Sequence, residues 1–377
     1  MKIERLDTYL QRVGDRPRVL VRITADDGIQ GWSEVYNHGP DLAYPPLLEY
    51  LFEQIRGMSA TSPGYVNQYL HQALRFPPGS LGLAAIAAID HALWDIAAKA
   101  LGVPVYRLLG GAMRDRVKVY AGLYSAPDIE DLGERIAALQ EASGYSAFKL
   151  SPYRKDLHTV RFGVLLRELE EWFGTIRQLW PDLEFGFDAH ACLWSPHQAT
   201  QMGQALAPYD PMFLEEPLRP EHKQAWGALR QTLTVPLATG ESLYSPHEFL
   251  DLLNAGGTDI AQPDICVVGG LTQMMRIAHL AELHQVDIAP HNPMGPLATA
   301  ANVHFAAAIH NFMILEYKPE EVSWCKDPYR PVDGYLELRP DRPGWGVEID
   351  MDALAADDWI HWQRQVPVRP DGSTAWM

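Results

Sequence analysis

The chain has 377 residues, of which 47% are hydrophobic and 21% are charged, and its 31 Lys and Arg against 48 Asp and Glu give a formal net charge of −17. A hydrophobic share of this size excludes a disordered chain, and the length predicts two domains or one large barrel. The acidic balance, without a run of Lys or Arg, argues against nucleic acid or an anionic membrane as a partner.

The N-terminal sequence differs from a secretory signal, because Glu4 and Asp7 interrupt the apolar run that a signal requires. The most apolar stretch, residues 81–89, is followed by Asp90 and Asp95, too early for a bilayer span. The three cysteines lie far apart and form no CxxC pair: Cys192, Cys266 and Cys325. This pattern argues against a disulfide framework and against a thiolate zinc site. We therefore expect a soluble, cytoplasmic protein with no membrane partner.

The first part of the chain contains both strand and helix patterns. Residues 19–24 are β-rich, and after the turn signal at 26–28 the chain returns at 30–35, which predicts a strand meander. The Ala-rich segment 83–101 predicts a helix, since Gly and Pro follow it at positions where they stop helices. Together these elements predict an α+β domain over residues 1–115.

From residue 116 onward, short apolar runs alternate with helical segments. Eight runs are strand candidates: 117–120, 147–150, 184–187, 212–214, 236–238, 259–261, 286–289 and 313–315. Strands that recur with helices between them predict βα units and a parallel sheet. Eight units fit an α/β fold of the (β/α)8-type barrel over residues 116–330, with a doubly wound sheet as the alternative. The remaining segment, 331–377, is expected to return to the first domain.

Three acidic residues follow successive strands of the predicted barrel. Asp188, Glu215 and Glu241 are spaced by 27 and 26 residues, which is one βα unit each. Parallel strands deliver the residues at their carboxyl ends to one rim of a barrel, where such folds place catalysis. Three clustered carboxylates need a cation to remain ionised together, and all-oxygen ligation suits Mg2+. The alternative is that these acids are helix N-caps or exposed loop carboxylates.

Two later strand ends add an acid and an imidazole. Asp264 and His291 follow neighbouring strands of the predicted barrel, so their side chains are expected to meet. A carboxylate beside an imidazole selects its tautomer and raises its basicity, which makes a general base. Taken alone, His291 fits a structural loop histidine as well; its place beside the carboxylate rim favours the catalytic interpretation.

These motifs together resemble those of a known family. The ordered set is DAH at 188–190, EEP at 215–217, GES at 240–242, QPD at 262–264 and PHNPMGPLATAAN at 290–302. It resembles the enolase superfamily in its mandelate racemase-like group, and within that group the acid-sugar dehydratases of the galactonate or gluconate type. The resemblance covers nearly the whole chain and implies an enolase-like barrel with an α+β capping domain.

The resemblance also implies roles for individual residues. It implies that the three rim acids bind Mg2+ and that the Asp264–His291 pair is the base. His190, two residues after the first rim acid, corresponds to a general acid of galactonate-type dehydratases. Glu316 is implied as a hydrogen-bonding partner of the substrate carboxylate or enolate, and Glu216 as a neighbour that supports the metal ligands. Members of this group commonly assemble, which implies a homo-oligomer.

One departure from the family pattern concerns the second barrel strand. Racemases and several dehydratases of the group carry Lys-x-Lys there, whereas this chain has Lys149 and, two residues later, Ser151. A serine hydroxyl is a poor base at neutral pH, so the departure argues against racemisation, which needs a donor and an acceptor on opposite faces. Lys149 is expected either to contact an anionic substrate or to pair with a rim carboxylate.

The loop after the predicted meander is the candidate for substrate recognition. Glu34, Tyr36, Asn37 and His38 offer hydrogen bonds suited to a polyol chain, although a polar surface loop is the alternative. The expected function is a Mg2+-dependent dehydratase that removes the α-proton of a sugar acid and eliminates the β-hydroxyl, giving a 2-keto-3-deoxy acid. An epimerase, racemase or cycloisomerase on the same site is one alternative. A barrel protein without catalytic activity is the other.

Overall fold

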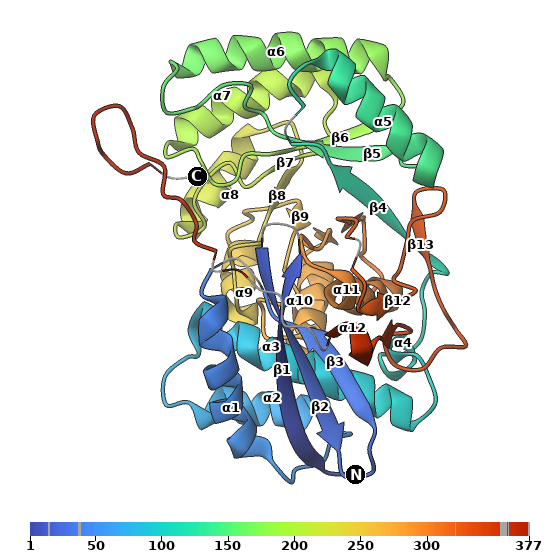
Figure 1. The fold of residues 1–377 in the computed structure, drawn as a ribbon. Helices are drawn as coiled ribbons and strands as arrows, with labels where there is room; N and C mark the ends of the chain where they lie inside the picture. The colour runs from blue at the N-terminus through green and yellow to red at the C-terminus, as the bar shows by residue number, and fades with distance from the viewer. Residues whose placement is uncertain are drawn as a thin grey trace.

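Figure 1 shows the computed structural model of the protein, in which the N-terminal sheet and its helices form one end and the parallel strands with their helices form the other. The structure describes residues 1–13, 16–36, 39–124, 126–320, 322–354, 360 and 362–375. Within these ranges the chain forms a three-stranded antiparallel sheet and a curled parallel sheet, so the predicted α/β barrel with an α+β cap is confirmed.

The cap sheet has the order β1-β2-β3, with β1 at Ile3–Val13, β2 at Arg16–Ala25 and β3 at Gln30–Glu34. The meander formed by β2 and β3 agrees with the prediction, and both pairings are antiparallel. Strand β1 was not predicted. It lies at the edge of the sheet with most side chains partly exposed, so charged residues interrupt its apolar pattern.

The cap helices cover the sheet and contribute most of the residues in the hydrophobic core of the cap. They are η1 (Asp41–Ala43), α1 (Tyr44–Ile55), α2 (Pro63–Ala73), α3 (Gly79–Ala100) and α4 (Val105–Leu108). Helix α3 packs against β2 and β3. The approach is close at Gly31, where an added Cβ would overlap the carbonyl oxygen of Ala92. Glycine at this position therefore allows the strand to touch the helix backbone.

The barrel strands begin and end close to the predicted runs. They are β4 (Arg116–Gly122), β5 (Ala147–Leu150), β6 (Glu184–Asp188), β7 (Phe213–Glu215), β8 (Leu237–Thr239), β9 (Ile260–Ala261), β10 (Asp287–Ile288) and β11 (Leu315–Glu316). Their order is β10-β9-β8-β7-β6-β5-β4-β11, and all neighbouring pairs are parallel. A parallel bridge between Ile288 and Phe312 links the two ends of this order.

Helices alternate with these strands and lie outside them (Figure 1). They are α5 (Ile129–Ser143), α6 (Phe162–Leu179), α7 (Pro196–Leu206) with η2 (Ala207–Tyr209), α8 (Lys223–Thr232), α9 (Pro246–Asn254), α10 (Leu271–Leu283) and α11 (Pro296–Ala308). After β11 the next described helix is α12 (Met351–Leu354), so the last barrel strand is followed by loops and short strands rather than by a long helix. This difference from an ideal eightfold repeat leaves the rim beside β11 free to meet the cap.

The C-terminal segment contacts both parts of the molecule. Its strands are β13 (Tyr335–Glu337), which pairs antiparallel with the barrel strand β4, and β14 (Glu348–Ile349), which pairs antiparallel with β12 (Cys325–Lys326) just before the segment. Farther along, the backbone N–H of Trp345 donates to Asp95 of the cap helix α3 at 3.0 Å. We propose the domain division 1–115, 116–330 and 331–377.

Helix α3 meets the length and composition of a membrane span, but 89% of its most apolar window is buried inside the protein. The acids that interrupt it are part of the contact between cap and barrel. Asp90 accepts hydrogen bonds from Asn67 of α2 and from the backbone and hydroxyl of Thr272 in α10. Asp95 accepts from the backbone of Trp32 at 3.0 Å. Helix α3 is thus a core helix held by its two buried carboxylates.

Two buried histidines pack against Trp345 where cap, barrel and C-terminal segment meet. The ring of His91 in α3 lies 6.1 Å from the Trp345 ring, and that of His304 in α11 lies 5.5 Å away. Burial lowers the pKa of His91 to about 3 and that of His304 to about 4. Both imidazoles are therefore neutral in the folded protein at neutral pH.

This neutrality predicts a loss of stability in mild acid. The unfolded histidines bind protons below their ordinary pKa of 6.5, and the folded ones do so only near pH 3 to 4. The free energy of unfolding is therefore expected to fall by about 1.4 kcal/mol per histidine between pH 7.5 and 5.5. In urea unfolding, His91→Gln should remove about half of the loss that the two histidines cause. The same substitution at the exposed His279 should leave the pH dependence unchanged, and an unchanged dependence in His91→Gln would contradict the account.

Candidate active site

Three carboxylates meet at the carboxyl ends of neighbouring barrel strands. Asp188 ends β6, Glu215 ends β7, and Glu241 lies two residues after β8. Asp188 and Glu215 are direct partners in the parallel register, which aligns the two strand ends. One carboxylate oxygen from each residue lies within 4.8 Å of the others. The spacing of one βα unit therefore brings the three predicted rim acids together as a carboxylate triad.

The three carboxylates repel one another unless a metal cation binds between them. Glu215 is completely buried, and burial together with the charge of Asp188 raises its pKa well above the usual range. Its Oε2 atom is buried without a hydrogen-bond partner among the described residues. An oxygen-only donor set with one unsatisfied carboxylate oxygen fits a hard divalent cation.

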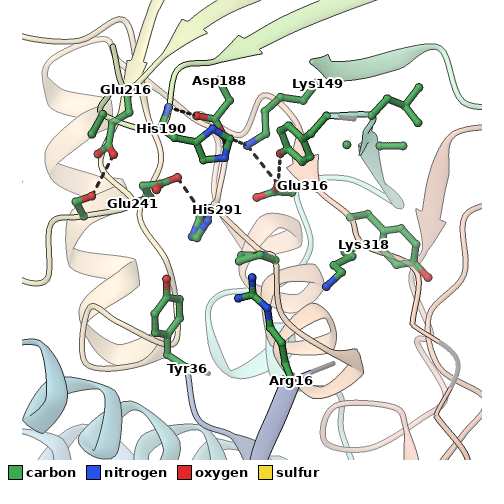
Figure 2. A pocket seen from close by; sticks show the side chains of 18 of the residues that line it. Arg16, Tyr36, Lys149, Asp188, His190, Glu216, Glu241, His291, Glu316 and Lys318 are labelled. Carbon is green, nitrogen blue, oxygen red and sulfur yellow. Dashed lines mark hydrogen bonds and ion pairs between the residues drawn. The ribbon is translucent and has the colours of Figure 1, made fainter. Parts of the chain in front are cut away.

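Lys149, at 1% exposure, is the buried cation in the midst of these acids. Its Nζ lies 2.8 Å from Glu215. It also lies 3.2 Å from Glu316 and 3.3 Å from Asp188 (Figure 2). Burial alone would lower its pKa, but the charges of Glu215 and Glu316 outweigh burial and raise the pKa well above its usual value. The structure therefore places Lys149 with the rim carboxylates, one of its two expected contacts, while it also lines the cavity.

His291 and Asp264 form the expected pair. The Nδ1 atom of His291 lies 2.8 Å from Oδ2 of Asp264, and Oδ1 of Asp264 accepts the backbone N–H of Cys266 at 2.7 Å. The other ring nitrogen, Nε2, lies 3.5 Å from Glu241. Burial lowers the pKa of His291, but the charge of Glu241 and the hydrogen bond to Asp264 outweigh it and raise the pKa to about 10. Because Glu241 contributes most to this rise, a cation that takes up its charge would bring the pKa of His291 down.

His190 lies beside Asp188, whereas His291 lies beside Glu241, so the two imidazoles contact different rim acids. Its Nε2 is 3.3 Å from Oδ2 of Asp188, and its backbone N–H donates to Oδ1 of the same residue at 2.8 Å. The side chain is 41% exposed and lines the cavity. Both His190 and Ala191 have positive φ values, of 50° and 55°, which non-glycine residues rarely adopt. Such strained backbone is characteristic of functional sites, and here it turns the imidazole back over the rim.

Glu316 completes the charged ring around Lys149. Its Oε2 accepts the backbone N–H of Asn292 at 3.0 Å, and its Oε1 accepts the hydroxyl of Tyr124 at 3.2 Å. Burial raises the pKa of Glu316, but Lys149 and His291 outweigh it and lower the pKa to about 2. Tyr124 was missed by the sequence analysis. It follows strand β4 as the other site residues follow theirs, but an aromatic side chain gave no polar signal there.

Glu216 is held differently from the rim acids. It accepts hydrogen bonds from the hydroxyls of Thr239 at 3.3 Å and Ser242 at 3.0 Å. Burial and the charge of Glu241 raise its pKa to about 8. Both effects favour the neutral form of Glu216 over its charged form.

The cap residues differ from the expectation in one respect. Tyr36 lines the cavity and its hydroxyl points towards Glu241 (Figure 2), whereas Asn37 and His38 lie outside the described residues. Glu34, expected to contact a polyol, is instead fully buried. It pairs with Arg18 and accepts the backbone N–H of Ala298, in the first turn of α11, at 2.6 Å. Its inward orientation on β3 makes it a link between cap and barrel.

A cavity of about 1020 Å³ lies between the rim and the cap, large enough for a small molecule. On the barrel side it is lined by most of the rim residues already described, but not by the buried Glu215 and Asp264. On the other side it is lined by cationic and aromatic side chains that the sequence analysis did not identify: Arg16, Lys318, Trp362 and Arg364. Figure 2 shows Arg16 and Lys318 across the cavity from the acids.

Comparisons with known proteins agree with this architecture. Residues 4–110 match the mandelate racemase/muconate lactonizing enzyme N-terminal domain, and residues 131–353 match the enolase C-terminal domain-like family. The chain is 34% identical to a D-galactonate dehydratase of Xanthomonas oryzae pv. oryzae and 33% identical to one of Variovorax paradoxus, with 100% of both chains covered in each case. It is also similar to the crystal structure of an enolase from Agrobacterium radiobacter, a proposed galactarate dehydratase bound to sodium and L-malate. That similarity has a TM-score of 0.98 and 54% identity, with 100% of each chain covered.

The geometry of the triad predicts cation binding that can be measured without any substrate. Because a bound cation relieves the repulsion among the acids, Mg2+ should raise the thermal midpoint of the EDTA-treated protein. At a free concentration of 100 times Kd the stabilisation should be about 2.7 kcal/mol. Glu215→Gln should abolish most of this rise. Glu184→Gln, at the opposite end of β6, is the matched control and should keep it. A full rise in Glu215→Gln would contradict the assignment of the triad.

Proposed function

The chain belongs to the mandelate racemase/muconate lactonizing enzyme family of the enolase superfamily, an enzyme family, and from this premise we propose that it is a Mg2+-dependent sugar-acid dehydratase, a hydro-lyase. The reaction removes the proton on the carbon next to the carboxylate and eliminates the β-hydroxyl, giving a 2-keto-3-deoxy acid. The observation that carries the proposal is one cavity lined by the Asp-paired His291, by His190 and by two acids of the triad, Asp188 and Glu241, with the third acid buried behind them.

Asp188, Glu215 and Glu241 would hold the cation. When bound, Mg2+ supplies positive charge to the substrate carboxylate and stabilises the negative charge that develops there. The oxygen-only donor set and the unpartnered Oε2 of Glu215 support this assignment. Lys149 balances part of the charge of the same acids, so that the site does not repel an anionic substrate.

His291 is the proposed base. The proton next to a carboxylate is very weakly acidic, so the acceptor must be oriented and the developing charge must be stabilised. Asp264 holds Nδ1 of the imidazole and leaves Nε2 beside Glu241, where it can take the α-proton. Glu316 is the proposed hydrogen-bonding partner at the carboxylate end of the substrate, with its own charge balanced by Lys149.

His190 is the proposed acid. As the α-proton leaves, the bond from the β-carbon to its hydroxyl breaks, and a proton from His190 converts the leaving group into water. The resulting enol becomes the keto acid by tautomerisation. The exposed position of His190 over Asp188, on a different part of the rim from His291, supports a division of labour between the two imidazoles.

The alternatives on the same site receive less support. An epimerase or racemase of this group would use a second lysine where this chain has Ser151, and the hydroxyl of Ser151 accepts the backbone N–H of Tyr153 in its own loop. A cycloisomerase has no specific observation in its favour. A barrel protein without catalytic activity would have no need for a strained, histidine-bearing turn beside three buried acids.

The proposal also covers the binding partners and the cellular location of the protein. The cavity size favours a small-molecule substrate, and the net charge of −17 argues against nucleic acid and membrane surfaces. We propose a soluble cytoplasmic enzyme that assembles as a homo-oligomer. The named relatives differ in the acid, galactonate in one set and galactarate in the proposed activity of the Agrobacterium radiobacter structure. Both acids have the same reacting carbons.

The proposed reaction is tested by incubating the enzyme and Mg2+ with a panel of aldonate and aldarate diastereomers. At least one acid should give a 2-keto-3-deoxy acid, detected by its semicarbazone absorbance, and EDTA should abolish the product. His291→Asn should lower kcat/KM by about 10³-fold, the scale of general base catalysis. His247→Asn, on the exposed surface of α9, is the matched control and should retain activity.

The same panel in D2O separates the two imidazoles and the alternative reactions. His190→Asn should still exchange the α-hydrogen of the substrate for deuterium, since His291 is intact, while keto-acid formation falls. Deuterium in the recovered acid of the wild-type enzyme without any keto acid would point to an epimerase instead. Neither exchange nor product across the panel would contradict the proposed function.

A further inference from the structure

An aromatic side chain after β4 touches two groups to which the proposed function assigns separate tasks. Tyr124 lines the cavity two residues after the strand ends, and 39% of its surface is exposed. Its ring centre lies 5.5 Å from that of His190, and its hydroxyl donates to Oε1 of Glu316 at 3.2 Å. Figure 2 shows His190 and Glu316 on the same side of the cavity, near the ammonium group of Lys149. One side chain therefore connects the proposed acid to the proposed partner of the substrate carboxylate.

The position of the Tyr124 ring depends on a glycine beneath it. A Cβ added to Gly122, the last residue of β4, would lie 2.6 Å from Cε2 of the tyrosine and 3.2 Å from its Cζ. An added methyl group would therefore displace the ring, which lies against the strand end because residue 122 has no side chain. Nζ of Lys149, on the neighbouring strand, lies 5.7 Å from the ring centre, where the π electrons attract a cation.

The contact between Tyr124 and His190 has the geometry of an edge-to-face aromatic pair. The two ring planes are inclined by 64°, an arrangement that aromatic rings favour over face-to-face stacking. The imidazole also contacts Asp188, through Nε2 at 3.3 Å from Oδ2. A contact at one atom does not define the plane of a ring, so the tyrosine supplies the second contact that does.

The hydroxyl of Tyr124 acts on the other group. It shares Oε1 of Glu316 with Nζ of Lys149, which lies 3.2 Å from that oxygen. The second oxygen, Oε2, accepts the backbone N–H of Asn292 at 3.0 Å. Both oxygens of Glu316 are thus bound, and its carboxylate is held in one orientation towards the cavity.

We propose that Tyr124 is a positioning residue with two separable parts. Its ring orients the imidazole of His190 for protonation of the leaving hydroxyl, and its hydroxyl orients the carboxylate of Glu316 for binding of the acid. This inference rests on the proposed function. Removal of the α-proton belongs to His291, whose imidazole contacts Asp264 and Glu241 and is therefore independent of the ring.

The test compares Tyr124→Phe with Tyr124→Leu in the Mg2+-loaded enzyme, using the acid of the panel that gives the most keto acid. Phenylalanine keeps the ring and loses the hydroxyl, so KM should rise about tenfold or more, the scale of a hydrogen bond to a charged group, with kcat nearly unchanged. Leucine also loses the ring, so kcat for keto acid should fall by about 10²-fold, the lower end of the effect of a positioned acid. Exchange of the α-hydrogen in D2O should persist in both variants.

Two further variants separate this role from a general loss of folding. Gly122→Ala displaces the ring without changing the tyrosine, and it should lower kcat in the same direction as Tyr124→Leu. Tyr65→Leu, at an exposed tyrosine of the cap helix α2, is the matched control and should leave kcat and KM unchanged.

A measurement without turnover tests the ring contact by itself. Carbethoxylation of His190 by diethyl pyrocarbonate, followed by mass spectrometry of the peptide that contains it, should be faster in Tyr124→Leu than in the parent enzyme. In Tyr124→Phe the rate should equal that of the parent, because the ring still covers one side of the imidazole.

The outcomes for the inference and for the proposed function are distinct. Equal losses of kcat in the two Tyr124 variants, loss of exchange together with product in Tyr124→Leu, or unchanged kinetics in that variant would overturn the role of Tyr124 in an enzyme that makes keto acid. Absence of both keto acid and exchange from the wild-type enzyme overturns the proposed function. In that case the carbethoxylation rates still decide whether the ring holds His190.

Discussion

Repulsion among carboxyl groups at the carboxyl ends of the barrel strands is the constraint on which the rest of the site depends. Six such groups meet there: Asp188, Glu215, Glu216, Glu241, Asp264 and Glu316. Lys149 offsets three of them, and the imidazole of His291 lies between two others. Burial and the charge of Glu241 raise the pKa of Glu216 to about 8, which favours its neutral form. Lys149 and His291 balance only part of the negative charge of the triad, where a divalent cation fits.

A second buried ionic network determines how the cap faces this rim. Arg18, from the cap strand β2, pairs with Glu34 of β3 and with Glu320 of the chain after β11. Glu34 also accepts the backbone N–H of Ala298 in the first turn of α11, where the helix dipole favours a negative charge. Removing one partner of such a buried network would leave a charge unpaired, at a cost of about 3–5 kcal/mol. The network therefore holds the cap at a fixed distance from the rim, across the cavity.

The sequence predicted the barrel and the rim because both depend on local periodicity. Strands recur once per βα unit, and the residue type at each strand end is visible in the sequence, so the positions of Asp188, Glu215 and Glu241 follow from spacing alone. The cap contribution could not be predicted in this way. Whether Glu34 faces substrate or core depends on Arg18 and on Ala298, 264 residues away. Likewise, Arg18 meets Glu320, 302 residues away, through a tertiary contact that no sequence period records.

The most direct test of the central claim is anomalous diffraction from a crystal of His291→Asn enzyme grown with Mn2+ and an unreacted sugar acid. The account predicts an anomalous peak bounded by Asp188, Glu215 and Glu241, with a carboxylate of the acid on it and the adjacent carbon facing position 291. A peak elsewhere in the cavity, or an acid bound with its carboxylate turned away from the three residues, would contradict it.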